Sequence, residues 1–302
     1  MSSTPPFPAL PTETLFDVGD LLTVPDLSAL SQTCRAFHVV FTLPLFRRVQ
    51  HSPEQHLFHV MQNNNVRLLT YLLDEGLPVD CTMTAFECAW PRPVCTLLHF
   101  AADSGSDALV RLLIDRGANI SAATTRNPEP QVRRAWVAYF ESLDADVGWT
   151  PLHCAAVKGH DVVAMLLIDN GAAVCTTAED ESTPLHWAAY AGHATMRELL
   201  IENGAVVCAA RDDGETPLHC AASESHPVVC ELLISKGANV SAVTTIGHTP
   251  LFSAAWLEDE EVARTLIANG ADVSIADKGG RTPLHDAAIC GQASVARLLI
   301  EN

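Results

Sequence analysis

A 33-residue repeat is the feature that most restricts how this chain of 302 residues can fold. The string Thr-Pro-Leu-His, or a near copy of it, begins at Thr150, Thr183, Thr216, Thr249 and Thr282. A fixed period of this length is typical of architectures in which each unit packs only against its neighbours. The chain also reaches the length at which one compact core stops growing, roughly 250–300 residues, which again favours an elongated stack.

The residues of each unit predict two short helices separated by tight turns. In the unit that begins at Thr150, the threonine suits the N-cap of the first helix. Pro151 suits the first helical position, where no intrahelical donor is needed. Gly159 and Gly171 suit the left-handed residues that end helices, and we expect the second helix between them, at 162–170. One such pair cannot bury its apolar face alone, so neighbouring units must stack.

This pattern resembles the ankyrin repeat over roughly residues 55–302. The resemblance implies an all-α solenoid of helix-turn-helix units with hairpin tips between them. A looser copy of the unit begins at Thr96, and a degraded copy precedes it. We therefore expect a degenerate repeat at 51–80, an insertion at 81–95, a repeat at 96–120, a second insertion at 121–149 and five repeats over 150–302.

The repeat register accounts for most of the histidines and cysteines. Five histidines occupy the fourth position of a unit and three occupy the eleventh, which favours structural hydrogen bonding over catalysis or metal binding. Most cysteines are interpreted as small core residues. Cys81, Cys88 and Cys95 lie seven apart in the first insertion, but a metal site there would need a fourth ligand, so we expect no metal and no cofactor. The histidines at the two positions are His99, His153, His186, His219 and His285, and His160, His193 and His226.

Composition and missing motifs exclude several classes of function. Eighteen lysines and arginines stand against thirty-six acidic residues, which excludes an unspecific nucleic-acid binder, because phosphate binding needs clustered basic side chains. From Thr150 onward 20 acids outnumber 8 bases. No stretch is apolar enough for a membrane span or a signal peptide, so we expect no membrane association and a location in the cytoplasm or nucleus. Without a GxSxG, HExxH or glycine-rich phosphate-binding motif, we expect no enzyme activity.

An ankyrin-like stack presents two variable surfaces, and the resemblance implies that protein partners bind there. One is formed by the tips before each Thr-Pro-Leu-His string and the other by exposed positions of the first helices. Aromatic residues among acids suggest a partner segment with basic and apolar character, although the acids alone also fit a solvated face. Trp187 is interpreted as packing between repeats, whereas Trp149 and Trp256 fit either packing or partner contact. The candidate partner-binding residues are Asp146, Val147, Trp149, Val157, Glu179, Asp180, Tyr190, Asp212, Asp213, Glu215, Glu224, Ile246, His248, Trp256 and Leu257.

The insertion at 121–149 predicts an amphipathic helix. After the turn signal at 127–130, Val132, Trp136, Phe140 and Leu143 recur at helical spacing on one face. This helix either covers the stack or supplies a contact that is specific to a partner.

Residues 1–50 do not follow the repeat and predict two or three short helices. The segment contains the string 10–13, Leu-Pro-Thr-Glu, and then Leu27, Leu30, Cys34 and Phe37. In these residues it resembles the F-box, which implies docking on the Skp-type linker subunit of a cullin-based SCF ubiquitin ligase. The residues implied in that docking are Leu10, Pro11, Leu15, Phe16, Leu22, Leu27, Leu30, Cys34 and Phe37.

Two residues of this segment depart from the F-box pattern. Gly19 stands where the family usually has a bulky apolar residue, and Phe46 replaces the usual terminal tryptophan. The first departure weakens the expected helix by up to about 1 kcal/mol.

Together the two resemblances predict an F-box protein with C-terminal ankyrin repeats. In this hypothesis residues 1–50 attach the chain to the linker and cullin ligase, and the stack presents a protein substrate without contributing bond chemistry. The alternative is an ankyrin-repeat scaffold or inhibitor unrelated to ubiquitin, in which the first fifty residues only cap the stack.

Overall fold

The computed structural model describes residues 57, 60–84, 94–125, 147–257 and 259–302. Several sequence predictions lie outside these ranges, namely the F-box-like helices of residues 1–50, Cys88, the helix in the second insertion and Asp146. The chain divides into two compact units. The described part of the first runs to Asn119 and includes Thr124 and Thr125, and that of the second comprises Ile120–Ala123 and the residues from Val147 onward.

The first unit contains three helices and a short hairpin among its described residues. Asn65 caps the first of these helices, since its Oδ1 accepts the Leu68 N–H at 3.1 Å. Ser106 caps the third by accepting the Leu109 N–H at 3.2 Å, and it donates to Asn64 Oδ1 at 2.6 Å. The elements are α5 (Val66–Asp74), β1 (Thr82–Thr84), β2 (Val94–Thr96), α6 (Leu97–Asp103) and α7 (Asp107–Asp115).

The repeats form the helical solenoid that the sequence predicted, and a short hairpin is added to it. Strands β1 and β2 pair antiparallel, with Thr82 opposite Thr96, at the two ends of the first insertion. Three threonines, a valine, a methionine and a cysteine form this pairing, and the β-branched ones favour extended backbone. The helical period that dominates the sequence gave no indication of it.

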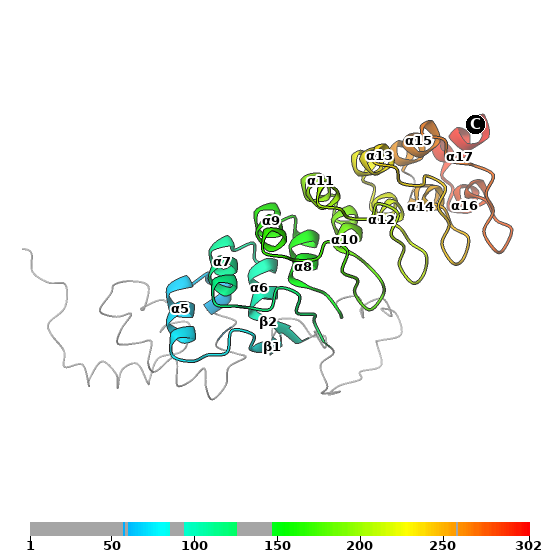
Figure 1. Ribbon diagram of the computed structural model, residues 1–302. Helices are drawn as coiled ribbons and strands as arrows, with labels where there is room; N and C mark the ends of the chain where they lie inside the picture. The colour runs from blue at the N-terminus through cyan, green and yellow to red at the C-terminus, as the bar shows by residue number, and fades with distance from the viewer. Residues whose placement is uncertain (1–56, 58–59, 85–93, 126–146, 258) are drawn as a thin grey trace, which may run out of the picture. The chain divides into compact units, whose positions relative to one another are not determined.

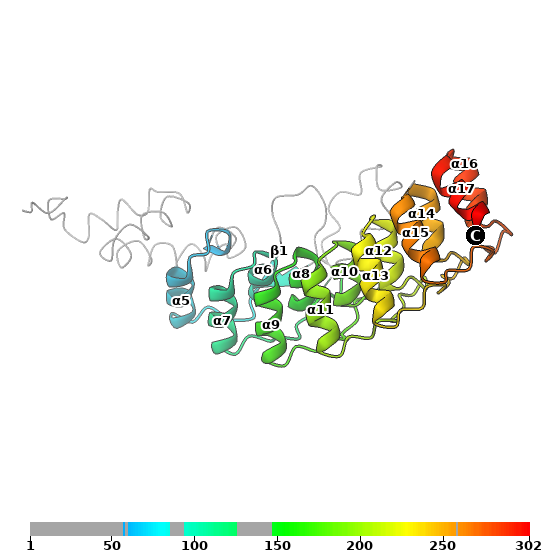
Figure 2. The same ribbon diagram turned by 90° about the horizontal axis from the view of Figure 1, so that it is seen from above.

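The second unit is a stack of five helix pairs, each of which begins one residue after its Thr of the repeat. The first helices lie side by side in one row and the second helices in another, with loops projecting from the row of first helices (Figures 1 and 2). We call these loops the tips. The pairs are α8 (Pro151–Lys158) and α9 (Asp161–Asp169), α10 (Pro184–Tyr190) and α11 (Ala194–Glu202), α12 (Pro217–Ser223) and α13 (Pro227–Ser235), α14 (Pro250–Leu257) and α15 (Glu260–Ala268), and α16 (Pro283–Cys290) and α17 (Ala293–Glu301).

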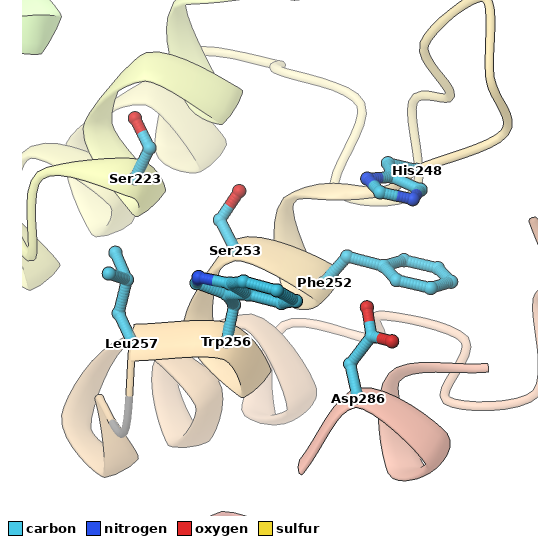
Figure 3. A pocket seen from close by; sticks show the side chains of 7 residues that line it. All are labelled: Ser223, His248, Phe252, Ser253, Trp256, Leu257 and Asp286. Atoms are coloured by element: carbon cyan, nitrogen blue, oxygen red, sulfur yellow. The ribbon is translucent and has the colours of Figure 1, made fainter. Parts of the chain in front are cut away.

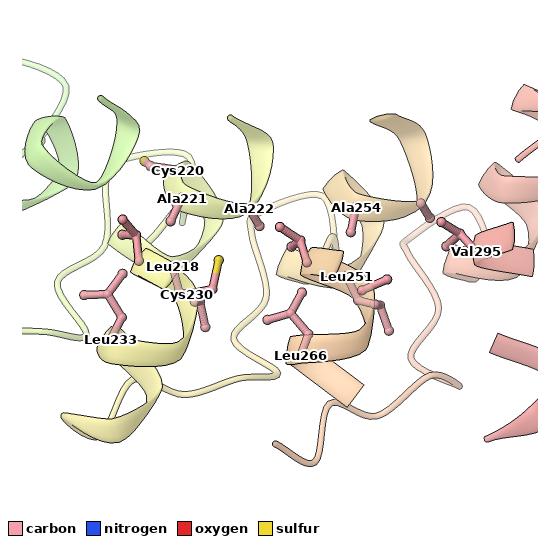
Figure 4. Close-up of a cluster of buried hydrophobic side chains, with 14 of the residues drawn as sticks. Leu218, Cys220, Ala221, Ala222, Cys230, Leu233, Leu251, Ala254, Leu266 and Val295 are labelled. Carbon is pink, nitrogen blue, oxygen red and sulfur yellow. The ribbon is translucent and has the colours of Figure 1, made fainter. Parts of the chain in front are cut away.

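Apolar side chains from consecutive pairs form one continuous core in this stack. Leu218, Leu233 and Leu251 are at most 1% exposed and lie between helices of neighbouring pairs (Figure 4). Cys220 and Cys230 are buried among them, as expected for small core residues, and burial raises the pKa of each thiol to about 12. The stack is therefore stabilised by packing between neighbours rather than by a separate core in each unit.

The tips are joined to one another by backbone hydrogen bonds. The Asp212 N–H donates to Asp180 O at 3.2 Å, and the Thr245 N–H donates to Asp213 O at 2.7 Å. Gly214 lies at this junction with φ +86°, and a Cβ on it would lie 2.9 Å from Thr244 Cα. Glycine is required there both by the left-handed backbone and by the close approach of the next tip.

Candidate functional site

The first helices and the tips of the second unit form a continuous surface, which we call the inner face. The eighth position of each repeat places a row of side chains along it, one from each first helix. Three of them are large, apolar and exposed, with exposed fractions of 41% for Tyr190, 57% for Trp256 and 67% for Ile289. Val157 and Ser223 complete the row and are half-buried. Exposed large apolar side chains on one face are typical of a surface that contacts another molecule.

Most of the predicted partner-binding residues retain accessible surface on this face. The exposed ones carry mainly acidic or apolar side chains, and a second set is half-buried. The exposed residues are Glu179, Tyr190, Asp212, Asp213, Glu224, Ile246, Trp256 and Leu257, and the half-buried ones are Val157, Asp180, Glu215 and His248.

Two of the predicted contact residues, Val147 and Trp149, are buried within the stack. Val147 is 7% and Trp149 8% exposed. The Trp149 ring lies against Trp187, with 4.7 Å between ring centroids, and stacks on His153 at 6.1 Å. Trp149 therefore packs within the stack, because the next repeat provides an aromatic surface for it.

An internal arginine occupies the aromatic surface around Trp187. The Arg211 guanidinium carbon lies 4.9 Å from the Trp187 ring centroid, and its Nη1 is 3.4 Å from Glu215 Oε2. Trp187 also donates from Nε1 to Ser182 Oγ at 3.0 Å, which agrees with its interpretation as a packing residue. Burial raises the pKa of Glu215, although Arg211 acts in the opposite direction. This part of the inner face already holds a cation from its own chain.

Tyr190 borders the same surface and is coupled to an acid of the next repeat. The negative charge of Glu224 raises the pKa of the Tyr190 hydroxyl, and a hydrogen bond between them adds to this effect. Tyr190 therefore combines an exposed ring with a hydroxyl that lies close to an acid.

The repeat that begins at Thr249 departs from the others at its fourth position. Phe252 replaces the histidine, and Thr249 Oγ1 has no hydrogen-bond partner among the described residues. The His248 ring stacks on the Phe252 ring instead, with 4.6 Å between centroids and an interplanar angle of 3°. The helix start is thus held by ring packing rather than by a capping histidine.

A pocket opens beside this ring pair. Its volume is about 260 Å³, and its lining comes from α12, α14, α16 and the tip before α14 (Figure 3). Trp256 and Leu257 lie at its exposed side, whereas Phe252 is buried. The lining residues are Ser223, His248, Phe252, Ser253, Trp256, Leu257 and Asp286.

Asp286 supplies the acidic group of the pocket. Its side chain comes from α16 and is directed toward the rings of α14 (Figure 3), and only 2% of the residue is exposed. Its Oδ1 accepts no hydrogen bond from the described residues, and Arg281 Nη1 lies 3.4 Å away without hydrogen-bond geometry. Arg281 also pairs with Asp277, whose Oδ2 lies 3.1 Å from Arg281 Nε, so that the two acids share one guanidinium. Asp286 therefore places a buried carboxylate, paired through a shared arginine, in the wall of the pocket.

Four of the pocket residues are absent from the residues predicted from the sequence, although two of them carried a visible signal. Phe252 breaks the histidine pattern at the fourth position, and Asp286 introduces an acid where other units have cysteine, tryptophan or serine. Ser223 and Ser253 carried no such signal. The pocket forms because two unusual residues, Phe252 and Asp286, come close together in adjacent repeats. The repeat register of the sequence alone does not show this proximity.

No group of three or more histidine, cysteine or acidic residues in the described ranges is placed to bind a metal ion. Within the same ranges no helix is long and apolar enough to cross a membrane. The histidines that a metal or catalytic hypothesis would need are engaged in hydrogen bonds along the stack. His153 Nε2, for example, lies 3.3 Å from Ser182 O, and His193 Nε2 lies 3.2 Å from Val157 O.

Comparison with known proteins identifies the repeats. A family model described as ankyrin repeats in three copies matches overlapping segments at 57–178, 131–211, 170–244, 207–277 and 242–302. A protein from Dasypus novemcinctus described as ankyrin repeat, SAM and basic leucine zipper domain-containing protein 1 is 33% identical over 129 residues, covering 37% of this chain and 25% of the relative. The Ovis aries protein of the same description is 34% identical over 120 residues, covering 34% of this chain and 23% of the relative.

This chain matches only about a quarter of the length of those relatives. No F-box is detected in residues 1–50, so docking on the linker subunit stays a prediction. The matches of the family model together extend over residues 57–302, well over half of the sequence. The chain therefore belongs to the ankyrin-repeat family.

Proposed function

We propose that this chain is a non-catalytic protein-interaction module whose inner face holds a segment of a partner protein. The observation that carries the proposal is the exposure of Trp256 and Leu257 beside a pocket. Neither side chain belongs to the apolar core of the stack. Large aromatic side chains at the edge of a pocket are typical anchors of protein interfaces. Ankyrin repeats in general act through such contacts and are not typically enzymes.

Site-specific photo-crosslinking tests which face binds partners. A photoreactive amino acid is placed at Tyr190 or Trp256 on the inner face, and at Met165 or Val228 on the second helices as matched controls. All four side chains are exposed, by 41%, 57%, 49% and 67% respectively. We expect crosslinks to partner proteins from the two inner-face positions. Crosslinks from the second-helix positions alone would overturn the proposal.

A second candidate function is that of a substrate receptor in an SCF-type ubiquitin ligase. It rests on the resemblance of residues 10–37 to the F-box, and chiefly on Leu10, Pro11, Cys34 and Phe37. In this proposal the linker and cullin ligase bind residues 1–50, and the ankyrin repeats bring the substrate close to the transferring enzyme. Both proposals place the chain in the cytoplasm or nucleus, where such complexes work.

Pull-down of the intact chain with the Skp-type linker separates the two candidates. The receptor proposal expects association that is lost when Leu10 and Pro11 are replaced by alanine, with the melting temperature of the repeats unchanged. A chain that fails to bind the linker, while a known F-box protein binds it in the same assay, leaves the interaction module as the function.

A further inference from the structure

The pocket at Asp286 differs from the surface around Trp187 in where its internal arginine lies. Around Trp187 the guanidinium of Arg211 covers the ring and faces Glu215. In the pocket, Arg281 pairs with two acids, Asp277 and Asp286. Among the described residues no arginine or lysine lies over the ring of Trp256, which is 57% exposed.

We infer that the pocket receives a basic side chain from a segment of a partner protein, with a bulky apolar side chain next to it in that segment. This inference deepens the proposed function, on which it rests, by naming the chemistry of the partner. The basic group lies against the exposed ring of Trp256 and beside the carboxylate of Asp286, which it shares with Arg281, so that a cation–π contact and a nearby negative charge act on the same group.

The charge around the pocket favours a cation over an anion. Glu224 follows the lining residue Ser223, and Asp259, Glu260 and Glu261 follow Leu257 along the chain. Of these acids, Glu260 pairs with Arg264. His248 lies 3.7 Å from Asp277 Oδ2, so the imidazole also faces an acid. The acids outnumber the basic residues, Arg264, Arg281 and His248, and an approaching basic segment is therefore attracted.

Apolar surface next to the pocket accounts for the second requirement. Leu257 is 46% and Ile289 67% exposed, and they lie on the neighbouring helices α14 and α16 that also carry Trp256 and Asp286. Covering them removes apolar area from water, which favours association. A basic side chain alone would leave this area exposed, so we expect both types of residue in the partner segment.

Selection from a random library of twelve-residue peptides with the full chain tests the inference. We expect the selected peptides to share an arginine or lysine beside leucine, phenylalanine or tryptophan. Their dissociation constants should rise at least about tenfold for Asp286→Asn and for Trp256→Ala. Val228→Ala, an exposed apolar residue of α13, and Asp169→Asn, an exposed acid of α9, should change them less than about twofold.

A double-mutant cycle then shows whether the basic side chain meets Asp286. The arginine or lysine of a selected peptide is replaced by methionine, and binding is measured to the wild-type chain and to Asp286→Asn. We expect the peptide substitution to weaken binding to the wild-type chain about tenfold and to have little further effect on the variant. Trp256→Ala repeats the cycle with a surface change that leaves the core intact.

Two results would overturn the inference. One is that the selected peptides lack a basic residue, and the other is that the two substitutions act independently. If such peptides still crosslink to the inner face, the interaction function stands and only the chemistry assigned to this pocket fails. If no peptide is selected and the inner face gives no crosslinks, the proposed function fails together with it.

Discussion

The histidine at the fourth position of a repeat is held as a single neutral tautomer by its hydrogen bonds. In the unit that begins at Thr216, the backbone N–H of Thr216 donates to His219 Nδ1 at 3.2 Å. Nδ1 therefore carries no proton, and Nε2 donates to His248 O of the next tip at 3.2 Å. A second proton would have to enter at Nδ1 and break the bond at the helix start. One side chain thus caps a helix and joins two repeats, but only while it is uncharged.

This arrangement predicts that mild acid destabilises the repeats. Burial lowers the pKa of His186 and of His219 from 6.5 to about 4. The unfolded chain binds more protons between these values, so the stabilisation is complete above pH 6.5 and is lost as the pH falls toward 4. Each histidine should cost about 2 kcal/mol of unfolding free energy at pH 5 relative to pH 7.5. Urea unfolding at the two pH values measures the difference.

The control is a substitution that removes the titrating group. His219→Asn should lose about 2 kcal/mol less than the wild-type chain over the same pH interval, and His186→Asn should behave alike. A wild-type chain and variants with the same pH dependence would show that these histidines are not buried in the neutral form.

Arg197 is another buried residue whose charge affects the stability of the stack. It is fully buried in α11 at a position where the other four helix pairs of the stack have alanine or cysteine. Its Nη1 donates to Val229 O in the next repeat at 3.2 Å, while its Nε has no hydrogen-bond partner among the described residues. Burial lowers its pKa, which means that the surroundings disfavour the charge.

Substitution of Arg197 should therefore depend on volume more than on charge. We expect Arg197→Met to leave the free energy of unfolding unchanged or to raise it, because an apolar side chain of similar length removes the desolvation cost. Arg197→Ala should lower it by about 2–4 kcal/mol through the cavity that remains. If methionine destabilises as much as alanine in urea unfolding, the hydrogen bond to Val229 is the larger contribution.

At the scale of the elements, hydrogen bonds join each tip to the next. The distance between neighbouring tips depends on a glycine two residues before the Thr of the repeat. Gly214 and Gly280 occupy this position in two tips, with φ of +86° and +78°. A Cβ at Gly214 would meet the backbone of the next tip, whereas a Cβ at Gly280 would have no atom within 4 Å. The two positions share their backbone conformation and differ in the neighbour.

Alanine substitutions at these two glycines distinguish the cost of backbone strain from the cost of a clash between neighbouring tips. Gly280→Ala should cost about 1 kcal/mol, the penalty of a left-handed residue with a Cβ. Gly214→Ala should cost about 2–4 kcal/mol, since the neighbouring tip must also move. Thermal unfolding of both variants measures the difference, and equal losses would mean that the hydrogen bonds between tips do not restrain their spacing.

At the scale of the whole molecule, local sequence signals were enough to predict the helices. The burial of Trp149 and the pocket were not predicted, because both depend on contacts between residues that are far apart in the sequence. The Thr-Pro pairs and the 33-residue period determined the helix starts, because caps and first-turn prolines act over a few residues. The burial of Trp149 depends on Trp187 one repeat later, and the pocket depends on Phe252 and Asp286 in adjacent repeats. Contacts between side chains of neighbouring repeats depend on how the repeats stack, and the sequence of a single repeat does not determine this.

The net negative charge of the chain, −18, predicts that partner binding depends on ionic strength. Most of this charge lies on the repeats that form the inner face, so a basic partner segment is attracted over a distance of about 10 Å at 0.1 M salt. We expect the dissociation constant of a selected peptide to rise about three- to tenfold between 50 and 300 mM salt, mainly through slower association. Glu224→Gln combined with Glu261→Gln should reduce this dependence, whereas Asp169→Asn on α9, farther along the stack from the pocket, should leave it unchanged. Stopped-flow measurement of the association rate distinguishes the variants.

An affinity that does not change with salt would show that the acids of this face only keep the stack solvated, because attraction between exposed charges must weaken as ions screen it.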